Sequence, residues 1–385
     1  MRNSGRVAIL LAVVMAASVV VEAMRPTAAM PPFAQSYGIN CEVCHTAVPA
    51  LNAYGRYVQR TGYSSLDAAT IHRANPLWFG ENGTYDTADG TAHHNIQAGN
   101  AAIHAAGYIG DDFTFHIHQW IWQNNGPGGT DTLWITYNNL LHRDGHLFLG
   151  KIEAPGPSPF SQFFDLSAFA APEITVGEHA YQNDGNRWGS KLVYVKPTFV
   201  AEAAYLANNG DLNTATDFSN DTDKTFQYRV ALARPDTPLE VGVVGNTGVL
   251  QVSDGRADNY NSQMLYAQLD PQHNLPGLLA MYQQGHDSHP GAGLQAAASS
   301  AYAAELYAPF FNGRTLLSAR SEMTNDGLGT VGHSQAINAE WMVFRDVNDR
   351  QAQGLMLNGQ ASMAPGSSPT WQMQLWWATT VGRLR

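Results

Sequence analysis

The residues with the clearest chemical potential form one short motif, Cys41-Glu42-Val43-Cys44-His45. The chain's only two cysteines both belong to it, and a histidine directly follows the second one. Two thiols at this spacing can form thioethers with the two vinyl groups of one haem, and the adjacent imidazole can then ligate the iron. The motif therefore predicts one covalently bound haem c, with His45 as an axial ligand of the iron.

Two other kinds of site use the same cysteine spacing. A thioredoxin-like redox pair requires a βαβ setting, and the flanking segments 31–40 and 46–59 do not show that pattern. A zinc site needs two further ligands, and the sequence has no second cysteine pair. Because both cysteines lie in one motif, a long-range disulfide framework is excluded as well. Haem is the interpretation that the motif favours.

The sequence leaves the second axial ligand of the iron open. His72 follows the motif, and Met30 precedes it; a methionine ligand would raise the reduction potential relative to a second histidine. An open sixth position is also consistent with the sequence, as is an ordinary polar role for each candidate. Four later histidines become candidates if another part of the fold closes over the haem: His93, His94, His116 and His118.

The first residues have the order of an export signal. Arg2 and Arg6 form a positive start, an apolar stretch follows, and small residues then offer cleavage after Ala23 or Ala29. The alternative is an uncleaved single-helix anchor, although the apolar stretch is short for a bilayer. We expect a signal peptide over residues 1–29, which agrees with haem attachment outside the cytoplasm.

The composition limits which partners and which class of fold are consistent with the chain. The formal net charge is −11, so the basic surface that a nucleic-acid partner would require is missing. A chain of 385 residues is long for one ordinary domain, although all-β barrels reach such lengths as single units.

From about residue 75 the chain consists of alternating segments separated by clusters of Asn, Asp, Gly and Pro. In one of them Phe226, Tyr228 and Val230 share a face, and Gln227 and Arg229 share the other. An even number of antiparallel strands can close into a barrel without edges. We expect about sixteen such strands, beginning near 76, 95, 112, 131, 146, 187, 198, 225, 239, 259, 277, 295, 313, 334, 353 and 370.

The polar faces decide between a membrane barrel and a soluble β fold. Charged residues lie on the strand faces opposite the apolar residues. A water-filled lumen can solvate these charges, whereas a dry protein interior cannot. A two-sheet sandwich could still place them outside. Aromatic residues near segment ends suit the interfacial girdles of a membrane barrel, and they also suit a large soluble core. We favour the outer-membrane barrel on the charged residues Glu202, Arg229, Arg320 and Glu322, with Trp120, Trp122, Trp134, Tyr137, Trp371, Trp376 and Trp377 as the girdle candidates.

The expected organisation is a signal peptide over 1–29, a small helical haem module over 30–74 and a transmembrane barrel over 75–385. One connection within the barrel, residues 154–186, is too long for a tight turn. It either folds into the lumen and narrows it, or forms a mobile external loop.

Further residues around the haem motif form a longer pattern. Phe33-Ala34 precedes the motif; Pro49, Leu51, Tyr54-Gly55-Arg56-Tyr57 and Gly62-Tyr63 follow it. This segment resembles the haem module of the outer-membrane fused monohaem cytochrome–porins, which include iron-oxidising outer-membrane cytochromes of chemolithotrophs. Tyrosine stands here where that family tends to have phenylalanine. Close agreement is confined to the haem module, and beyond it only the architecture matches.

The resemblance implies a haem module in the pore or facing the periplasm, in the outer membrane of a Gram-negative bacterium. It implies oxidoreductase-type electron transfer from an extracellular donor, Fe(II) in the best-known members, to a periplasmic c-type cytochrome. Arg56 is a candidate partner of a haem propionate, because guanidinium and carboxylate match as a fork, or else a surface arginine. Phe33, Tyr54 and Tyr57 either pack on the porphyrin or fill a small core.

Two other functions compete with electron import. The barrel could be a solute pore with a haem-bearing plug or sensor, or the chain could be a soluble periplasmic β-rich cytochrome. His116 and His118 are also candidates for a transient metal contact, with an ordinary polar strand face as the alternative.

Overall fold

The computed structural model describes residues 43–47, 50–66, 77–86, 95–123, 126–157, 171–181, 183, 185–207, 224–272, 275–311, 315–346, 353–363 and 370–380. The expected signal peptide and several site candidates lie outside the described residues: Met30, Phe33, Cys41, His72, His93 and His94. The side chains of the final strand, with its tryptophans, lie outside the described part as well.

Long antiparallel strands dominate the described chain. Sixteen of them have nine or more residues, and each begins within three residues of a position that the alternation predicted. They are β3 (Leu77–Asp86), β4 (Asn95–Ile109), β5 (Phe113–Gln123), β7 (Thr130–Leu140), β8 (Gly145–Glu153), β11 (Asn186–Lys196), β12 (Phe199–Ala207), β13 (Lys224–Leu232), β14 (Leu239–Gln251), β15 (Ala257–Leu269), β16 (Gly277–Asp287), β17 (Ala297–Phe310), β18 (Thr315–Asn325), β19 (Val331–Asp346), β20 (Gln353–Met363) and β21 (Thr370–Thr380).

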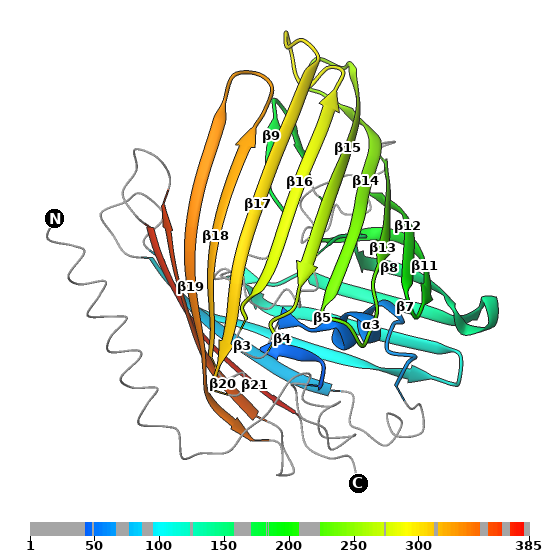
Figure 1. Cartoon of the computed structure of the whole chain (residues 1–385), viewed down its shortest axis with the longest axis vertical. Coiled ribbons are helices and arrows are strands. Elements are labelled where there is room, and N and C mark those ends of the chain that lie inside the picture. Colours follow the sequence, from blue (N-terminus) through cyan, green and yellow to red (C-terminus); the bar gives the residue numbers. More distant parts are fainter. Residues whose placement is uncertain are drawn as a thin grey trace, which may run out of the picture.

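Strand pairing closes these strands into a barrel. Each long strand pairs antiparallel with its neighbours in the chain, β8 pairs with β11, and the last strand, β21, pairs with the first, β3. A two-residue strand, β6 (Gly126–Pro127), adds to the edge of β5 beside β7. Figure 1 shows β14–β18 standing side by side, with the only labelled helix near one end of the strands.

The remaining described elements are short. A β-hairpin of β1 (His45–Ala47) and β2 (Ala50–Leu51) precedes the helix α3 (Ala53–Arg60), and η2 (Leu141–Arg143) lies in the turn after β7. The expected helical haem module therefore contains, in its described part, one helix of eight residues. No described helix has the length and apolar character to cross a bilayer.

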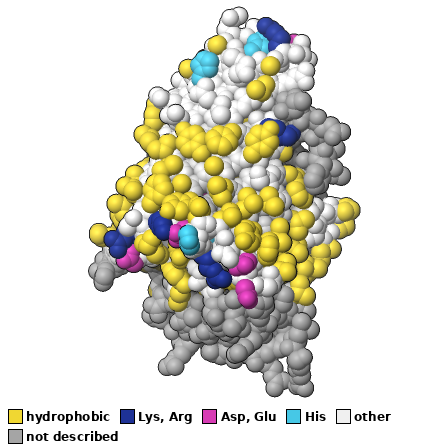
Figure 2. Space-filling view, turned by 90° about the vertical axis from the view of Figure 1, so that its right-hand side faces the viewer, with side chains coloured by type: hydrophobic (Ala, Val, Ile, Leu, Met, Phe, Trp, Pro, Cys, Tyr) yellow, Lys and Arg dark blue, Asp and Glu magenta, His cyan; other side chains and the backbone are white. Residues whose placement is uncertain are grey.

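Apolar side chains cover the outside of the barrel, and the buried inner face carries both polar side chains and three apolar clusters. In β13, Phe226 and Val230 point outward and are 44% and 43% exposed, whereas the side chains of Gln227 and Arg229 point inward and are buried. The same alternation runs through β12, β15, β16 and β17. Figure 2 shows hydrophobic side chains over the middle of one side, with charged side chains gathered towards its ends. This inverted pattern is typical of a membrane barrel.

The predicted lumenal charges are where the alternation placed them, but two tryptophans are not. Glu202, Arg229 and Arg320 face inward and are at most 9% exposed. The girdle prediction is wrong for Trp120 and Trp134, which are buried on the inner face, while Trp122 is 43% exposed outside. Trp120 and Trp134 follow the inward alternation of their strands, whereas a register shift opposite the end of β5 separates Trp122 from Trp120.

Part of the long connection after β8 folds against the inner wall, as one of the two alternatives predicted. Its hairpin of β9 (Ile174–Val176) and β10 (His179–Tyr181) packs on inward-facing residues of β15 and β17. The buried contact consists of Ile174, Val176 and Tyr181 from the hairpin with Tyr260, Ala297 and Ala301 from the wall.

Candidate haem site at the barrel mouth

The described half of the motif lies in the short hairpin before α3. Cys44 is half-buried and His45 is 7% exposed. The backbone amide of Asn52 donates to the carbonyl of Cys44 at 3.0 Å, and its side-chain amide donates to the carbonyl of Val43 at 3.1 Å. Asn52 also caps α3, because its Oδ1 accepts from the amide of Gly55 at 3.0 Å. One residue thus ties the motif to the start of the helix.

Gly55 is required by how closely the helix approaches the motif. A Cβ at this position would lie 1.9 Å from the carbonyl oxygen of Cys44. Backbone atoms cannot move aside as the end of a flexible side chain can, so any larger residue would separate α3 from the motif.

A cavity of about 500 Å³ borders the motif. His45, Asn52 and Tyr54 line one side of it, and the turns after β13 and β15 line the other with Pro235, Pro238 and Pro271. Its volume falls within the roughly 300–1,000 Å³ of small-molecule and cofactor sites. The residues present therefore fit a haem: an imidazole that can ligate iron borders a space of cofactor size. The second predicted thioether position, Cys41, lies outside the described residues.

Burial disfavours the thiolate form of Cys44. Burial raises its pKa to about 11, because a thiolate is poorly solvated there.

Arg56 is 1% exposed, so it is not a surface arginine, and its guanidinium is engaged by the barrel wall. Its pairing with a haem propionate stays a prediction. Nη1 and Nη2 donate to the two carboxylate oxygens of Asp270 at 2.8 and 3.1 Å, and Nε donates to Glu240 at 3.1 Å. The adjacent carboxylates raise the pKa of Arg56 above its usual value. Arg56 thus anchors α3 to β14 and to the turn after β15.

A second arginine on the same helix extends this anchor. Arg60 donates through both terminal nitrogens to the two oxygens of Glu240, at 2.9 and 2.7 Å. Glu240 also accepts from the hydroxyl of Tyr266 at 2.7 Å. Arg229 lies 3.5 Å from Glu240 and 2.5 Å from Glu202, its cross-strand partner. The bidentate pairs of Arg56 with Asp270 and of Arg60 with Glu240 hold α3 in one orientation against the wall.

The end of α3 is locked to the opposite wall by the Gly-Tyr pair of the sequence pattern. Gly62 and Tyr63 both have positive φ angles, 55° and 69°. This turn buries the ring of Tyr63, whose hydroxyl lies 3.2 Å from Nδ1 of His116 and whose ring centroid lies 5.5 Å from that of Trp134. Tyr108 donates to the carbonyl of Tyr63 at 3.2 Å. Gly62 is the residue type that this conformation favours.

The helix packs closely against part of the lumen wall. A cavity between them, bounded by Arg60, Tyr63, Glu153 and Arg229, has a volume of about 30 Å³. That is room for about one water molecule. At this contact α3 and the charged wall leave little space.

The other candidates are dispersed. His116 and His118 both face the lumen from β5; the ring of His118 lies 4.0 Å from that of His104, and its Nδ1 lies 2.7 Å from Asp131. Tyr54 and Tyr57 lie on α3 with ring centroids 6.4 Å apart, and both are partly buried. Sequence reasoning missed Glu240 and Asp270, because nothing in their local pattern distinguishes a carboxylate that receives a distant arginine from an ordinary polar residue.

Comparison with known proteins supports the fold. No family model matches the chain, and no curated protein matches it by sequence. A loop-deleted variant of OmpT, an outer membrane protein of Vibrio cholerae, is similar in structure with a TM-score of 0.52 at 11% identity, over 79% of this chain and 97% of that chain. An anion-selective porin from Comamonas acidovorans has a TM-score of 0.49 at 13% identity, over 78% of this chain and 98% of that chain. The fold class is thus a porin-like antiparallel β-barrel.

Proposed function

We propose that this protein is an outer-membrane cytochrome–porin fusion. In this proposal the barrel spans the outer membrane, one haem c is held at its periplasmic mouth by Cys41, Cys44 and His45, and electrons pass from an extracellular donor to a periplasmic c-type cytochrome. The observation that carries it is the placement of a CxxCH histidine, buried beside a cavity of about 500 Å³, at the mouth of a porin-like barrel.

The surface supports a membrane location. The outward residues Leu265, Leu306 and Ile337 are 58%, 52% and 52% exposed, which is costly in water and favourable against lipid. The inward positions carry the ion pairs. A soluble β protein would have the reverse arrangement, so this observation opposes the soluble periplasmic alternative.

Connection lengths support the orientation. Outer-membrane barrels have short turns on the periplasmic side and longer loops outside. The turns that line the haem cavity belong to the end with the short connections, where the expected periplasmic cytochrome could dock. The connections at the cavity end are 110–112, 141–144, 197–198, 233–238, 270–276, 311–314 and 347–352; the longest at the other end are 154–185, 208–223 and 288–296.

The protein's own residues would position the haem and shield it from solvent. When bound, the haem would supply a one-electron carrier whose potential follows its ligand, burial and hydrogen bonds. His45 would hold the iron, and α3 would hold His45 in place through Asn52 and the Arg56 anchor. Fe(II) is the donor that we propose, by resemblance to the iron-oxidising members of the family.

The haem assignment is tested by the absorption spectrum of the purified, reduced protein after denaturation and acetone extraction. We expect haem bands that stay with the polypeptide in the wild type, and that are lost in the Cys41→Ala, Cys44→Ala double variant because both thioethers are removed. Cell fractions should show the wild-type bands in the outer membrane. A mature protein without these bands would end the proposal.

The donor is tested separately. Fe(II) added outside intact cells should reduce the haem within the mixing time, and His45→Ala should abolish that response while leaving the barrel in the membrane. If external Fe(II) leaves the haem oxidised while another external donor reduces it, the iron assignment is wrong but the electron-transfer role stands.

A second function, a solute pore with the haem segment as plug, rests on the porin-like fold. The helix α3 packs on one part of the lumen wall, where a cavity of about 30 Å³ is left between them. Single-channel conductance in planar bilayers separates the two, since we expect the intact protein to conduct far less than an unplugged barrel of this strand number.

A further inference from the structure

The second feature of the lumen lies at the other end of the barrel from the haem cavity, on the β9–β10 hairpin. Asp258 is near the start of β15, and Asp270 of the haem cavity follows its end, so about 40 Å of strand separates them. The hairpin is pinned at its tip, where Glu178 accepts from the amide and the hydroxyl of Ser253 at 2.7 and 2.6 Å. It presents His179 to the wall.

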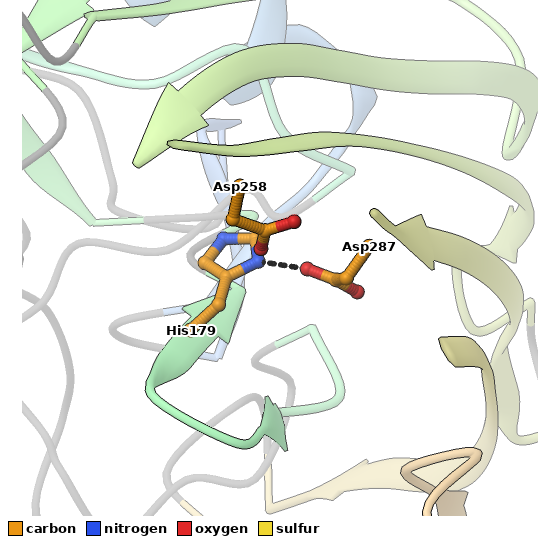
Figure 3. A group of neighbouring side chains, drawn as sticks. All are labelled: His179, Asp258 and Asp287. Carbon is orange, nitrogen blue, oxygen red and sulfur yellow. Dashed lines mark hydrogen bonds and ion pairs between the residues drawn. The ribbon is translucent and has the colours of Figure 1, made fainter. Parts of the chain in front are cut away.

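Three potential ligands converge there. His179, Asp258 and Asp287 each offer an atom within 4.8 Å of the others, and Nδ1 of His179 lies 2.5 Å from a carboxylate oxygen of Asp287. Figure 3 shows the two carboxylates and the imidazole pointing toward one another, from two strands of the wall and from the hairpin. Both aspartates are 0% exposed and His179 is 4% exposed.

One carboxylate oxygen in this cluster has no hydrogen-bond partner. Oδ1 of Asp258 accepts from the amide of His289 at 2.8 Å, but Oδ2 is buried without a partner. Asp287 accepts from the hydroxyl of Tyr181 at 2.7 Å through its other oxygen. Among the described residues no lysine or arginine pairs with either aspartate. The basic group beside them is the imidazole of His179, 2.5 Å from Asp287, and two buried carboxylates that share one imidazole favour a further positive charge between the three groups.

We propose that His179, Asp258 and Asp287 form a binding site for a divalent transition-metal ion at the extracellular mouth. One imidazole and two carboxylates suit zinc, iron(II) or manganese(II), whereas calcium and magnesium prefer oxygen alone. Three donors at about 2.0–2.2 Å from one ion lie roughly 3.3 Å apart, so the ligands need only small shifts. Solvent completes the coordination.

The surroundings hold the ligands in place and provide an approach. Rings of Tyr181 and Tyr260 lie 4.2 and 4.1 Å from the imidazole of His179, which restricts its rotation. Tyr181 also orients Asp287 from outside the ligand set, as partners of metal-bound carboxylates commonly do. Glu178, on an adjacent exposed turn, adds negative charge to this rim, whereas Asp254 is paired with Arg256 and His289. The site stands whether or not the protein transfers electrons.

The test uses the full-length, haem-loaded protein in detergent, stripped with a chelator and titrated with Zn²⁺ in a calorimeter. We expect about one zinc ion per chain beyond the haem iron, together with a zinc-dependent rise in Tm. Asp258→Asn with Asp287→Asn should abolish both effects. Asp236→Asn is the control, since Asp236 is an exposed aspartate at the other end of the barrel, and the variant should bind zinc as the wild type does.

Tyr181→Phe tests the site without removing a ligand, in case the ligand variants fail to fold. It removes only the hydroxyl that donates to Asp287 and keeps the packing of the ring. We expect it to weaken zinc binding by about 10–100-fold while the unliganded Tm changes little. Wild-type protein that binds no zinc, or ligand variants that bind it unchanged, would overturn the proposal. The three residues would then be a proton-sharing hydrogen-bond network that holds the hairpin.

Discussion

At the scale of single residues, the residues around the haem motif hold the motif, the helix α3 and the barrel wall together. Asn52 caps the helix and binds the motif's backbone, Gly55 permits the contact of helix and motif, and Arg56 fixes the helix to the wall. The resemblance to cytochrome–porins drew attention to Gly55-Arg56 and Gly62-Tyr63. The structure gives each pair a reason that does not depend on the cofactor: close approach and ion pairing for the first, a left-handed turn for the second.

Gly55→Ala tests the close approach. In an exposed helix this change stabilises by about 1 kcal/mol, but here the new methyl group would meet the carbonyl oxygen of Cys44. We expect a net loss of roughly 1–3 kcal/mol and reduced haem incorporation. Urea titration in detergent and the haem-to-protein absorbance ratio measure the two effects. Gly126→Ala, whose Cβ would have no neighbour within 3.4 Å, is the control and should change neither; a stabilised Gly55→Ala would contradict the geometry.

Glu240→Gln tests the ion-pair anchor. Glu240 receives Arg56, Arg60 and Arg229, so neutralising it leaves three buried guanidinium groups with fewer acceptors. Removing one partner from a buried pair typically costs about 3–5 kcal/mol. We expect that loss in the free energy of unfolding, with faster trypsin cleavage at Arg60 and higher bilayer conductance as the helix loosens. Asp236→Asn, in an exposed pair with Arg234, should stay within about 0.5 kcal/mol of wild type.

At the scale of elements, the two lumenal insertions are short and depend on the wall. The helix α3 has eight residues, too few for stability by itself, and the strands of the β9–β10 hairpin have three residues each. Each is held by contacts from residues more than 70 positions away in the chain. These insertions are therefore parts of the barrel interior, rather than domains that fold independently.

Ile174→Ala tests how the hairpin is held. Ile174 is 3% exposed in the contact with Tyr260 and Ala297, and truncating a buried isoleucine costs about 2–5 kcal/mol. Because the barrel itself keeps its pairing, we expect the loss to appear as local opening. Hydrogen exchange at hairpin amides should accelerate while β15 and β16 stay protected. Thr175→Ala, on the exposed face of the same strand, is the control; equal exchange in both variants would mean that the apolar contact does not hold the hairpin.

At the scale of the whole molecule, the chain is inside-out relative to a soluble protein. Its exposed band is apolar, and its buried ion pairs gather in the lumen around α3. The proposed haem and metal sites lie at opposite mouths, so each can be altered without the other.

Leu265→Arg tests whether the band faces lipid. Leu265 is 58% exposed near the middle of β15, and arginine near the bilayer midplane costs about 2–4 kcal/mol. We expect that loss for folding into phospholipid vesicles, measured by urea titration. Asn259→Arg, outward on the same strand but near its end, should cost at most about 1 kcal/mol. Equal effects at both positions would indicate that water, not lipid, surrounds the strands.

The sequence alone determined the local part of this protein. Alternation placed all sixteen strands to within three residues, because one apolar and one polar face impose a period of two on every strand. It also set the inward position of Glu202 and Arg229, and the haem motif follows from five adjacent residues. Tertiary structure decided what these groups meet. Arg56 reaches Glu240 and Asp270, 184 and 214 residues away, and His179 reaches Asp287 across 108. Barrel closure sets those pairings, and no local pattern encodes them.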